Sequence, residues 1–557
     1  MEFGLDFNIN EFPVNSKQKN LDEAYIEYLN LIYGNVISFF NENYESIELK
    51  ENVSLAESLR RRYLLCNINN LPKIIITEAS DKLFADLIKQ YPGCGIIICT
   101  NQQFFRIIEI KSREKIIYFS RYLQRFLNPK ANAYIFKNFF MRLKLCFLPV
   151  MLLLGIFYSG LLYYFANSIY FINTIFKIII FKISLKYTSS YKRPLLEYSE
   201  LPIYTILIPL YREAAKLQQI IDSVRALNYP SDKLDVKLVI EYDDVQTYKA
   251  LKLLNIPKYI HILRVPDIFP KTKPKACNYA MQFALGEFVV IYDAEDKPEP
   301  DQLLNAVAKY KGLDSSYACL QARLKIEHTK FDILGFLFKL EYEMWFSYLL
   351  NGLAAMKLPI PLGGTSNHFR VSALREIGMW DPYNVTEDAD IGIRLNLEGY
   401  KVGMLDSYTM EEPPMSLKAW LKQRVRWIKG FMVTSFCYLN HDKKKQSMLE
   451  KMAVVIFVIF SVISFLVSPI IIMNGLFLTN NAPLLLFSHI NLAIFLVFFW
   501  PVAYFLIKSS SIQNSLLNII IIILFPLYFI LHSLAAYLAL IELLWKPFRW
   551  NKTDHLV

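Results

Sequence analysis

The sequence predicts two α/β domains combined with transmembrane helices, the larger domain being built on a mostly parallel sheet. Three observations support this fold class. Hydrophobic residues make up 54% of the 557 residues and aromatic residues 15%, which is too apolar for an ordinary soluble enzyme. Long stretches carry no charge although 20% of all residues are charged, so the charges are concentrated in soluble domains. Short apolar runs alternate with amphipathic stretches over residues 195–434, as in βαβ units.

The net charge is +11, from 61 Lys and Arg against 50 Asp and Glu. Such an excess occurs in nucleic-acid-binding proteins, but it also follows from basic loops that face anionic lipid. Because of the apolar stretches we favour the membrane interpretation and expect no nucleic-acid partner. The seven cysteines have no Cys-x-x-Cys spacing, which is typical of buried thiols in a reducing compartment.

The first element is a small α/β domain over residues 1–112, predicted from helical patterns and two β-rich runs at 73–77 and 95–100. Its N-terminus lacks the pattern of a cleaved signal, so we expect this domain in the cytoplasm, where it could have a regulatory role. Residues 113–144 follow and are basic and aromatic, as in a helix that lies on anionic headgroups. The alternative for this segment is a solvated charged helix.

The second element is a transmembrane hairpin over residues 145–182. Residues 145–176 contain no charged side chain, and a single helix of this length would extend about 48 Å, beyond an apolar layer of about 30 Å. Asn167 and Ser168 lie in the middle, and basic residues flank both ends, which favours a hairpin with both ends in the cytoplasm. The alternative is one tilted span followed by an interfacial helix, which would place the flanking soluble regions on opposite sides.

The last elements follow the larger domain. Residues 435–545 predict a transmembrane bundle of three to four helices, because residues 452–507 contain no Lys, Arg, Asp or Glu and residues 515–541 are long enough for a further span. Residues 546–557 form a basic tail, which we expect on the cytoplasmic side of the membrane.

Carboxylates follow the apolar runs of the larger domain, at the strand ends where ligands bind in open α/β sheets. Closely spaced carboxylates repel one another unless a cation lies between them, and together with phosphate oxygens they suit Mg²⁺ or Mn²⁺. Taken alone, such a turn is more often a helix cap or a solvated turn. The carboxylates concerned are Glu213, Asp243, Asp244, Asp293, Glu295 and Asp296.

A basic loop and a Gly-rich turn add to this pattern. The loop carries Lys271, Lys273 and Lys275 before a helix expected near Cys277, where lysines could offset phosphate charge; a solvated basic loop is an equal alternative. The turn at 363–370 would let backbone approach a ligand, and Asp388 follows it. A carboxylate opposite a cation-bound diphosphate is where a general base for an incoming hydroxyl is needed.

A final pattern precedes the C-terminal bundle. Gln423, Arg426 and Trp427 are spaced i, i+3 and i+4 and therefore share one helix face. They offer a hydrogen bond, a phosphate clamp and a platform on which a sugar can stack. A Trp and Arg pair at a membrane interface is the alternative.

These motifs, in this order, resemble those of the inverting GT-A glycosyltransferases of family 2, the superfamily of cellulose and hyaluronan synthases. The resemblance covers residues 201–434 and rests on IPLYREA, Asp243-Asp244, KPKACNYAM, DAED, GGTSNHFR, VTEDADIGIRL and QRVRW. It implies a GT-A domain over 195–434 that transfers a hexosyl group from a nucleotide diphosphate-sugar, expected to be a UDP-sugar, with Mg²⁺ or Mn²⁺. The implied acceptor is a polysaccharide or a membrane lipid, and the implied location is a bacterial-type cytoplasmic membrane with the catalytic domain on the cytoplasmic side.

The resemblance also implies roles for single residues. The family has Asp where Glu295 stands, which leaves open whether Glu295 or Asp296 contacts the metal. Thr553, in a tail similar to a Trp-x-Lys-Thr-x-His pattern of some relatives, is a possible gating residue over bound nucleotide. The implied roles are nucleotide binding for Tyr211, Glu213, Asp243 and Lys275, metal and diphosphate binding for Asp293 and Glu295, general base for Asp388, and acceptor or diphosphate contacts for Gln423, Arg426 and Trp427.

A different class of function is also compatible with this fold. The chain could be a catalytically inactive membrane sensor, receptor or scaffold that keeps the transferase shape. The complete set of carboxylates argues against it. A transporter is less compatible, because almost all charged residues lie outside the apolar runs.

Overall fold

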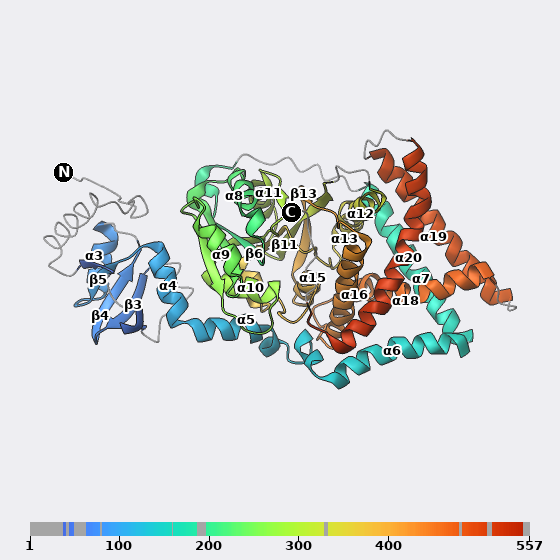
Figure 1. The fold of residues 1–557 in the computed structure, drawn as a ribbon, viewed down its shortest axis with the longest axis horizontal. Coiled ribbons are helices and arrows are strands. Elements are labelled where there is room, and N and C mark those ends of the chain that lie inside the picture. Colours follow the sequence, from blue (N-terminus) through green and yellow to red (C-terminus); the bar gives the residue numbers. More distant parts are fainter. Residues whose placement is uncertain are drawn as a thin grey trace. The chain divides into compact units, whose positions relative to one another are not determined.

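A computed structural model describes residues 37–40, 44–49, 63–77, 81–158, 160–186, 196–327, 332–477, 482–509 and 515–549. The chain divides into two compact units (Figure 1). The first comprises residues 1–120 with 257–261 and 279–285, and the second comprises the remainder. Thr553, proposed from the sequence as a gating residue, lies outside the described residues.

The N-terminal unit is built on a five-stranded sheet in the order β1-β5-β4-β3-β2. Strands β3 and β4 form a hairpin whose turn residues, Asn69 and Asn70, have φ of 53° and 62°, as a two-residue turn with both residues left-handed requires. The two β-rich runs of the sequence form β4 and β5. The elements are β1 (Ile37–Phe39), β2 (Ile47–Leu49), β3 (Tyr63–Ile68), β4 (Leu71–Ile76), α3 (Asp81–Gln90), β5 (Gly95–Ile98), α4 (Asn101–Lys111) and α5 (Arg113–Leu127), the last of which continues into the second unit.

The larger sheet has eight strands in the order β10-β13-β11-β12-β9-β6-β7-β8. Strand β6 pairs in parallel with both β7 and β9, and β11 pairs in parallel with β13. Strand β12 is antiparallel to both of its neighbours, so the sheet is mixed. Its strands are β6 (Tyr204–Leu210), β7 (Leu234–Glu241), β8 (Ile260–Val265), β9 (Phe288–Ile291), β10 (Lys297–Pro298), β11 (Tyr317–Ile326), β12 (Asn367–Arg370) and β13 (Lys401–Glu411).

Helices connect these strands and lead to the membrane segments. The amphipathic stretch after β6 forms α8, and a π-helical segment over Glu343–Leu349 joins α12 to α13. The helices are α8 (Leu217–Arg225), α9 (Val245–Lys252), α10 (Lys273–Ala280), α11 (Gln302–Lys311), α12 (Ile333–Tyr342), α13 (Leu350–Ala355), α14 (Val371–Glu376), α15 (Glu387–Leu397) and α16 (Leu417–Leu439).

The strand order reverses at β6. The next strand in the sequence, β7, lies on one side of β6, and β9 lies on the other. In open α/β sheets a crevice forms at such a point, outside the carboxyl ends of the strands, and ligands bind there. The turns after β6 and β9 carry Tyr211, Glu213, Asp293 and Glu295, so the topology brings these residues to the same edge of the sheet.

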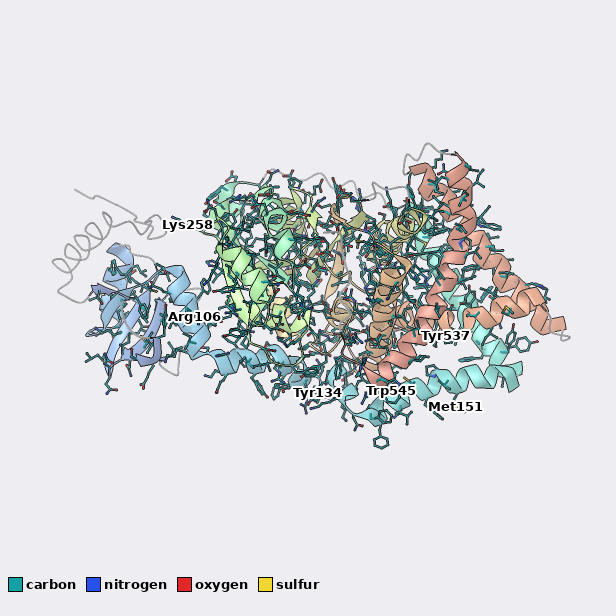
Figure 2. The ribbon with its side chains drawn as sticks, viewed as in Figure 1. Arg106, Tyr134, Met151, Lys258, Tyr537 and Trp545 are labelled. Carbon is teal, nitrogen blue, oxygen red and sulfur yellow. The ribbon has the colours of Figure 1, made fainter. Side chains whose placement is uncertain are left out.

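In the part of the chain that the structure describes, five long apolar helices and the short helix α17 complete the second unit. Among the described residues, four helices are long and apolar enough to cross a membrane, over Leu161–Lys186, Met448–Met473, Ser488–Ser509 and Leu516–Trp545. Tyr537 of α20, which is labelled in Figure 2, donates its hydroxyl to the Leu466 carbonyl oxygen of α18. The segments are α6 (Phe139–Tyr158), α7 (Gly160–Lys186), α17 (Met448–Val454), α18 (Phe460–Phe477), α19 (Ala482–Ser509) and α20 (Ser515–Trp545).

The region expected to form a hairpin contains two helices, and the break lies earlier than Asn167 and Ser168. Helix α6 ends at Tyr158 and α7 begins at Gly160. Asn167 lies inside α7, where its amide donates to the Tyr163 carbonyl oxygen at 3.0 Å and accepts from Asn491 of α19 at 2.7 Å. Because Asn491 of the neighbouring helix binds Asn167, this polar residue is stable in the middle of a helix, and its polarity did not mark the turn.

Candidate active site

The turns after β6 and β7 support each other through backbone contacts. Arg212 has φ of 59°, and its N–H donates to the Asp244 carboxylate at 2.5 Å. Asp244 also caps α9 by accepting from the Thr247 N–H at 3.2 Å. Asp243 pairs with Lys271 at 2.7 Å, and hydrogen bonding to that ammonium lowers the pKa of Asp243. Asp244 is therefore structural, while Asp243 is a partly exposed carboxylate at the rim of the strand ends.

Lys273 and Lys275 point to different environments. Helix α10 begins at Lys273, not near Cys277 as expected, and side chains two positions apart on a helix do not share a face. Lys275 is 2% exposed and pairs with Glu241 at 2.8 Å. Lys273 instead forms an ion pair with Asp293 and donates to the Gly364 carbonyl oxygen at 2.7 Å. The ammonium at the Asp293 carboxylate therefore comes from Lys273.

The three acidic residues after β9 have different surroundings. Asp296 is 4% exposed and accepts from the Asp293 N–H at 2.7 Å and from the Thr365 hydroxyl. Burial, followed by the neighbouring carboxylates, raises the pKa of Asp296. The side chains of Asp293 and Glu295 line a cavity, whereas Asp296 does not. Asp296 therefore closes the turn, and Asp293 and Glu295 are the two carboxylates that face the cavity.

Carboxyl groups are crowded around this turn. Burial and then the Asp293 and Glu295 carboxylates raise the pKa of Glu411 to about 8. Burial and then Asp388 raise the pKa of Glu387 to about 8, and burial also raises the pKa of Asp388. Lys273 is buried, which opposes its charged form, but Asp293 and Glu387 more than offset this and raise its pKa. A site with this arrangement favours a bound cation.

The chemistry of these groups fits a divalent ion. No set of three or more His, Cys, Asp or Glu side chains arranged as a metal site occurs among the described residues. Mg²⁺ is typically bound through one or two carboxylates together with substrate phosphates and water. Asp293 and Glu295 supply two such carboxylates, and a cation already lies against one of them, the Lys273 ammonium. Asp293 and Glu295 are thus the residues that would hold a divalent cation such as Mg²⁺ or Mn²⁺.

The Gly-rich turn and the segment before α15 are held in close contact. A Cβ on Gly364 would lie 3.3 Å from the Asp388 carboxylate, so the backbone passes directly beside this side chain. Asn384 donates its amide to the Thr434 hydroxyl of α16 at 2.9 Å. A Cβ on Gly430 of α16 would lie 1.9 Å from the Thr386 hydroxyl oxygen. Close packing therefore fixes Asp388 between the Gly-rich turn and α16.

Helix α16 presents the Gln, Arg and Trp side chains to the same cavity. Ser416 caps the helix by accepting from the Ala419 N–H at 3.2 Å, and Gln423, Arg426 and Trp427 line the cavity one turn further on. The Trp427 and Tyr342 ring centroids are 6.2 Å apart. The expected shared face is therefore present and lies beside Asp388, which lines the same cavity.

A buried network that the motifs did not indicate holds this helix. Arg424 is 1% exposed, forms an ion pair with Glu341 of α12, and its Cζ lies 4.1 Å from the Trp427 ring centroid. Glu341 also accepts from Tyr528 at 2.5 Å and lies 3.2 Å from His532 Nε2, both on α20. Burial opposes ionisation of Glu341, but Arg424 and His532 outweigh it and lower its pKa to about 2. The local sequence gives no signal for this network, because Lys339 and Glu343 flank Glu341 in the same helical stretch.

One cavity of about 580 Å³ joins these features and continues between the membrane helices. Of the residues expected at the site, Asp243 and Lys275 are not part of its wall. The expected residues that line it are Tyr211, Glu213, Asp293, Glu295, Asp388, Gln423, Arg426 and Trp427. Lys271 and Lys273 of the basic loop also line it. Further wall residues that the sequence analysis did not single out include Glu341, Glu387, Glu411, Glu412 and Arg424.

Comparison with known proteins gives the class of this site. The model of glycosyl transferase family group 2 matches residues 288–541. A probable glycosyltransferase, YdaM, of Bacillus subtilis is 24% identical over 331 residues, which cover 57% of this chain and 76% of the relative. Glucomannan 4-beta-mannosyltransferase 1 of Oryza sativa is 26% identical over 246 residues, which cover 42% of this chain and 47% of that relative. The chain thus spans about half the length of the plant relative.

A solved structure also resembles the chain. The mannosyltransferase PcManGT from Pyrobaculum calidifontis, in complex with GDP-Man and Mn²⁺, has a TM-score of 0.43 and 16% identity, over 68% of this chain and 99% of that one. The mixed sheet, its switch point at β6 and the carboxylates after β9 define a GT-A-type nucleotide-sugar transferase domain combined with apolar helices. The family match over residues 288–541 and these relatives support a family 2 glycosyltransferase, and thus a hexosyltransferase.

Proposed function

We propose that the chain is a membrane-embedded inverting glycosyltransferase that moves a sugar from a nucleotide diphosphate-sugar to a hydroxyl of a polysaccharide or membrane-lipid acceptor. The observation that carries this proposal is the single cavity, whose wall runs from the carboxylates after β9 past Asp388 to the apolar helices. Donor and acceptor can therefore meet in one continuous cavity.

The proposed reaction is a single displacement. The acceptor oxygen attacks the anomeric carbon, the bond from that carbon to the diphosphate oxygen breaks, and the acceptor proton passes to Asp388. Arg426 pairs with the departing diphosphate, and Trp427 stacks against the acceptor. Bound Mg²⁺ or Mn²⁺ would supply charge stabilisation to the leaving diphosphate. Attack from the face opposite the leaving group inverts the anomeric configuration.

On the nucleotide side, the proposal assigns Tyr211 and Glu213 to the wall beside the base and ribose, because both follow β6 at the switch point and line the cavity. Asp243 lies on the same strand-end edge, within reach of a nucleotide that extends over the rim. Lys273 is a better candidate than Lys275 for the diphosphate, because Lys275 is buried against Glu241. A UDP-sugar and a GDP-sugar are the donors to compare.

Location follows from the same chemistry. Nucleotide sugars are cytoplasmic, so the proposal places the catalytic domain on the cytoplasmic side of a bacterial-type inner membrane. The basic residues before β6 and between α16 and α17 agree with this orientation.

Donor use is tested with the purified full-length chain in nanodiscs. UDP-glucose, UDP-N-acetylglucosamine and GDP-mannose are supplied with Mn²⁺ or with a chelator, and released nucleotide diphosphate is measured. We expect release from at least one donor that requires the cation and is lost in Asp293→Asn. Cation-independent release from every donor, or none at all, would contradict the proposal and favour the inactive alternative.

Acceptor class is tested by labelling membranes with the radiolabelled donor and extracting them with chloroform and methanol. Label only in the organic phase would establish a lipid acceptor and exclude a polysaccharide. Label retained in insoluble material of high molecular mass would establish a polysaccharide acceptor and exclude a lipid.

A further inference from the structure

Lys177 is a positive charge inside a candidate membrane span. It lies on α7 within Leu161–Lys186 and lines the cavity described above. Its ammonium has neither a hydrogen bond nor an ion pair with any residue that the structure describes. Unpaired charges in such segments cost a few kcal/mol and are usually retained where they bind a partner or line a polar path. A ligand in the cavity is therefore the expected partner of Lys177.

A stripe of neutral polar groups accompanies this lysine. Asn173 and Thr174 precede Lys177 by four and three residues and so share its helix face. The Asn173 amide donates to the Ser464 hydroxyl at 3.1 Å and accepts from Ser461 at 3.3 Å, so α7 and α18 meet along this stripe. All of these side chains line the cavity. Together they surround the ammonium with small hydroxyl and amide groups.

The stripe lies between the apolar bundle and the catalytic domain. Three residues beyond Lys177, the Ile180 carbonyl oxygen would be 2.4 Å from a Cβ on Gly352 of α13, so α7 touches the catalytic domain there. In the other direction the cavity wall is mainly aromatic and apolar, with Ser468 and His532 as polar members. Its members on α18, α19 and α20 include Phe465, Phe495, Phe498, Phe499 and Phe529. A ligand here therefore meets a cation and hydroxyls on one side and an apolar wall on the other.

This combination selects among the acceptors left open above. An ammonium flanked by hydroxyl and amide groups suits a phosphate, through charge-assisted hydrogen bonds. The apolar wall suits a hydrocarbon chain, which the hydroxyls alone would not favour. A neutral glycan would leave the ammonium unpaired, and a neutral lipid would do the same.

We propose that Lys177, with Asn173, Thr174, Ser461 and Ser464, binds the phosphate of a lipid acceptor, whose tail lies along the aromatic wall and whose reactive hydroxyl reaches Asp388. This proposal rests on the glycosyltransferase function proposed above and names its acceptor class. It assigns Lys177 to acceptor binding and leaves the donor side unchanged.

The test measures lipid binding to the full-length chain in nanodiscs by native mass spectrometry. The probes are decaprenyl-diphosphate-linked N-acetylglucosamine, neutral glucosyl-diacylglycerol, phosphatidylglycerol and an acidic glucuronate-containing tetrasaccharide. We expect the lipid diphosphate to bind the wild type about tenfold more tightly than Lys177→Gln, as for the loss of one charge-assisted hydrogen bond. Lys177→Arg should retain binding, and Ser464→Ala should weaken it. Lys182→Gln, an exposed lysine on the same helix, is the matched control and should match the wild type.

Three results would overturn the proposal. Equal binding of the lipid diphosphate to the wild type and Lys177→Gln would remove Lys177 from the site. Lys177-dependent binding of phosphatidylglycerol at equal strength would make this a site for bulk phospholipid. Lys177-dependent binding of the acidic tetrasaccharide alone would make the ligand a glycan. Cation-dependent nucleotide release is measured in the same samples. If the wild type shows no such release, the proposed function is contradicted. If Lys177→Gln keeps the release but binds the lipid diphosphate more weakly, the present proposal is supported.

Discussion

Glu341→Gln is expected to destabilise the second unit by about 3 kcal/mol. Glu341 holds Arg424, and Tyr528 and His532 of α20, in a site where Arg424 is 1% exposed. The lowering of the Glu341 pKa from 4.5 to about 2 corresponds to about 3 kcal/mol in favour of its ionised form. Removing one partner of a buried ion pair costs about 3–5 kcal/mol, so the two magnitudes agree.

The assay is equilibrium unfolding in mixed micelles, followed by tryptophan fluorescence and circular dichroism. Glu343→Gln, two residues away, is the matched control and should change stability by less than about 0.5 kcal/mol. Glu341→Gln combined with Arg424→Met should recover much of the loss, because neither charge is then left unpaired. If Glu341→Gln were no more destabilising than Glu343→Gln, the network would not support α16 as we argue.

The same residue gives a pH dependence. Because the pKa of Glu341 is lowered in the folded chain, its contribution is fully present above about pH 4.5 and is lost as the pH falls toward about 2. The difference in stability between the wild type and Glu341→Gln should therefore shrink over this range. A constant difference from pH 7 to pH 3 would contradict the assignment.

Three further perturbations test the geometry of the site. Gly430→Ala places a Cβ 1.9 Å from the Thr386 hydroxyl oxygen and should lower sugar transfer at least tenfold, whereas Gly312→Ala, with its nearest atom at 3.6 Å, should not; equal transfer rates would argue against close packing of α16 on this turn. Lys275→Met leaves Glu241 unpaired and should lower the free energy of unfolding by about 3–5 kcal/mol. Lys273→Met should instead weaken nucleotide binding measured by calorimetry. Weaker nucleotide binding in Lys275→Met but not in Lys273→Met would assign the nucleotide role to Lys275. Glu295→Gln should raise the Mn²⁺ concentration needed for half-maximal nucleotide release, and Asp296→Asn should mainly lower the unfolding temperature; a larger metal effect in Asp296→Asn would make Asp296 the ligand.

Local patterns predicted much of the fold and of the candidate site. Apolar runs followed by carboxylates located the ends of β6 and β9, because the hydrophobic pattern of a strand and the residue types of a turn are both set by neighbouring residues in the sequence. The spacing of Gln423, Arg426 and Trp427 likewise sufficed to place them on one face.

Contacts between distant segments could not be predicted in this way. Glu341 and His532 are 191 residues apart, and nothing near either residue indicates the other. The choice between Lys273 and Lys275 depended on where α10 begins, and an error of a few residues in a helix start changes which side chain faces the site. Asn167 was expected near a turn, yet a partner on α19 holds it inside a helix.

The most direct test of the account is transfer of radiolabelled sugar by the purified chain carrying Asp388→Asn. The amide keeps the shape of the side chain and removes the base, so transfer to acceptor should fall by at least 10²-fold while nucleotide binding stays within about threefold of the wild type. Asp406→Asn, which alters a surface ion pair with Arg323, is the matched control and should transfer normally. Near-normal transfer by Asp388→Asn would contradict the central claim that Asp388 is the base of an inverting displacement in this cavity.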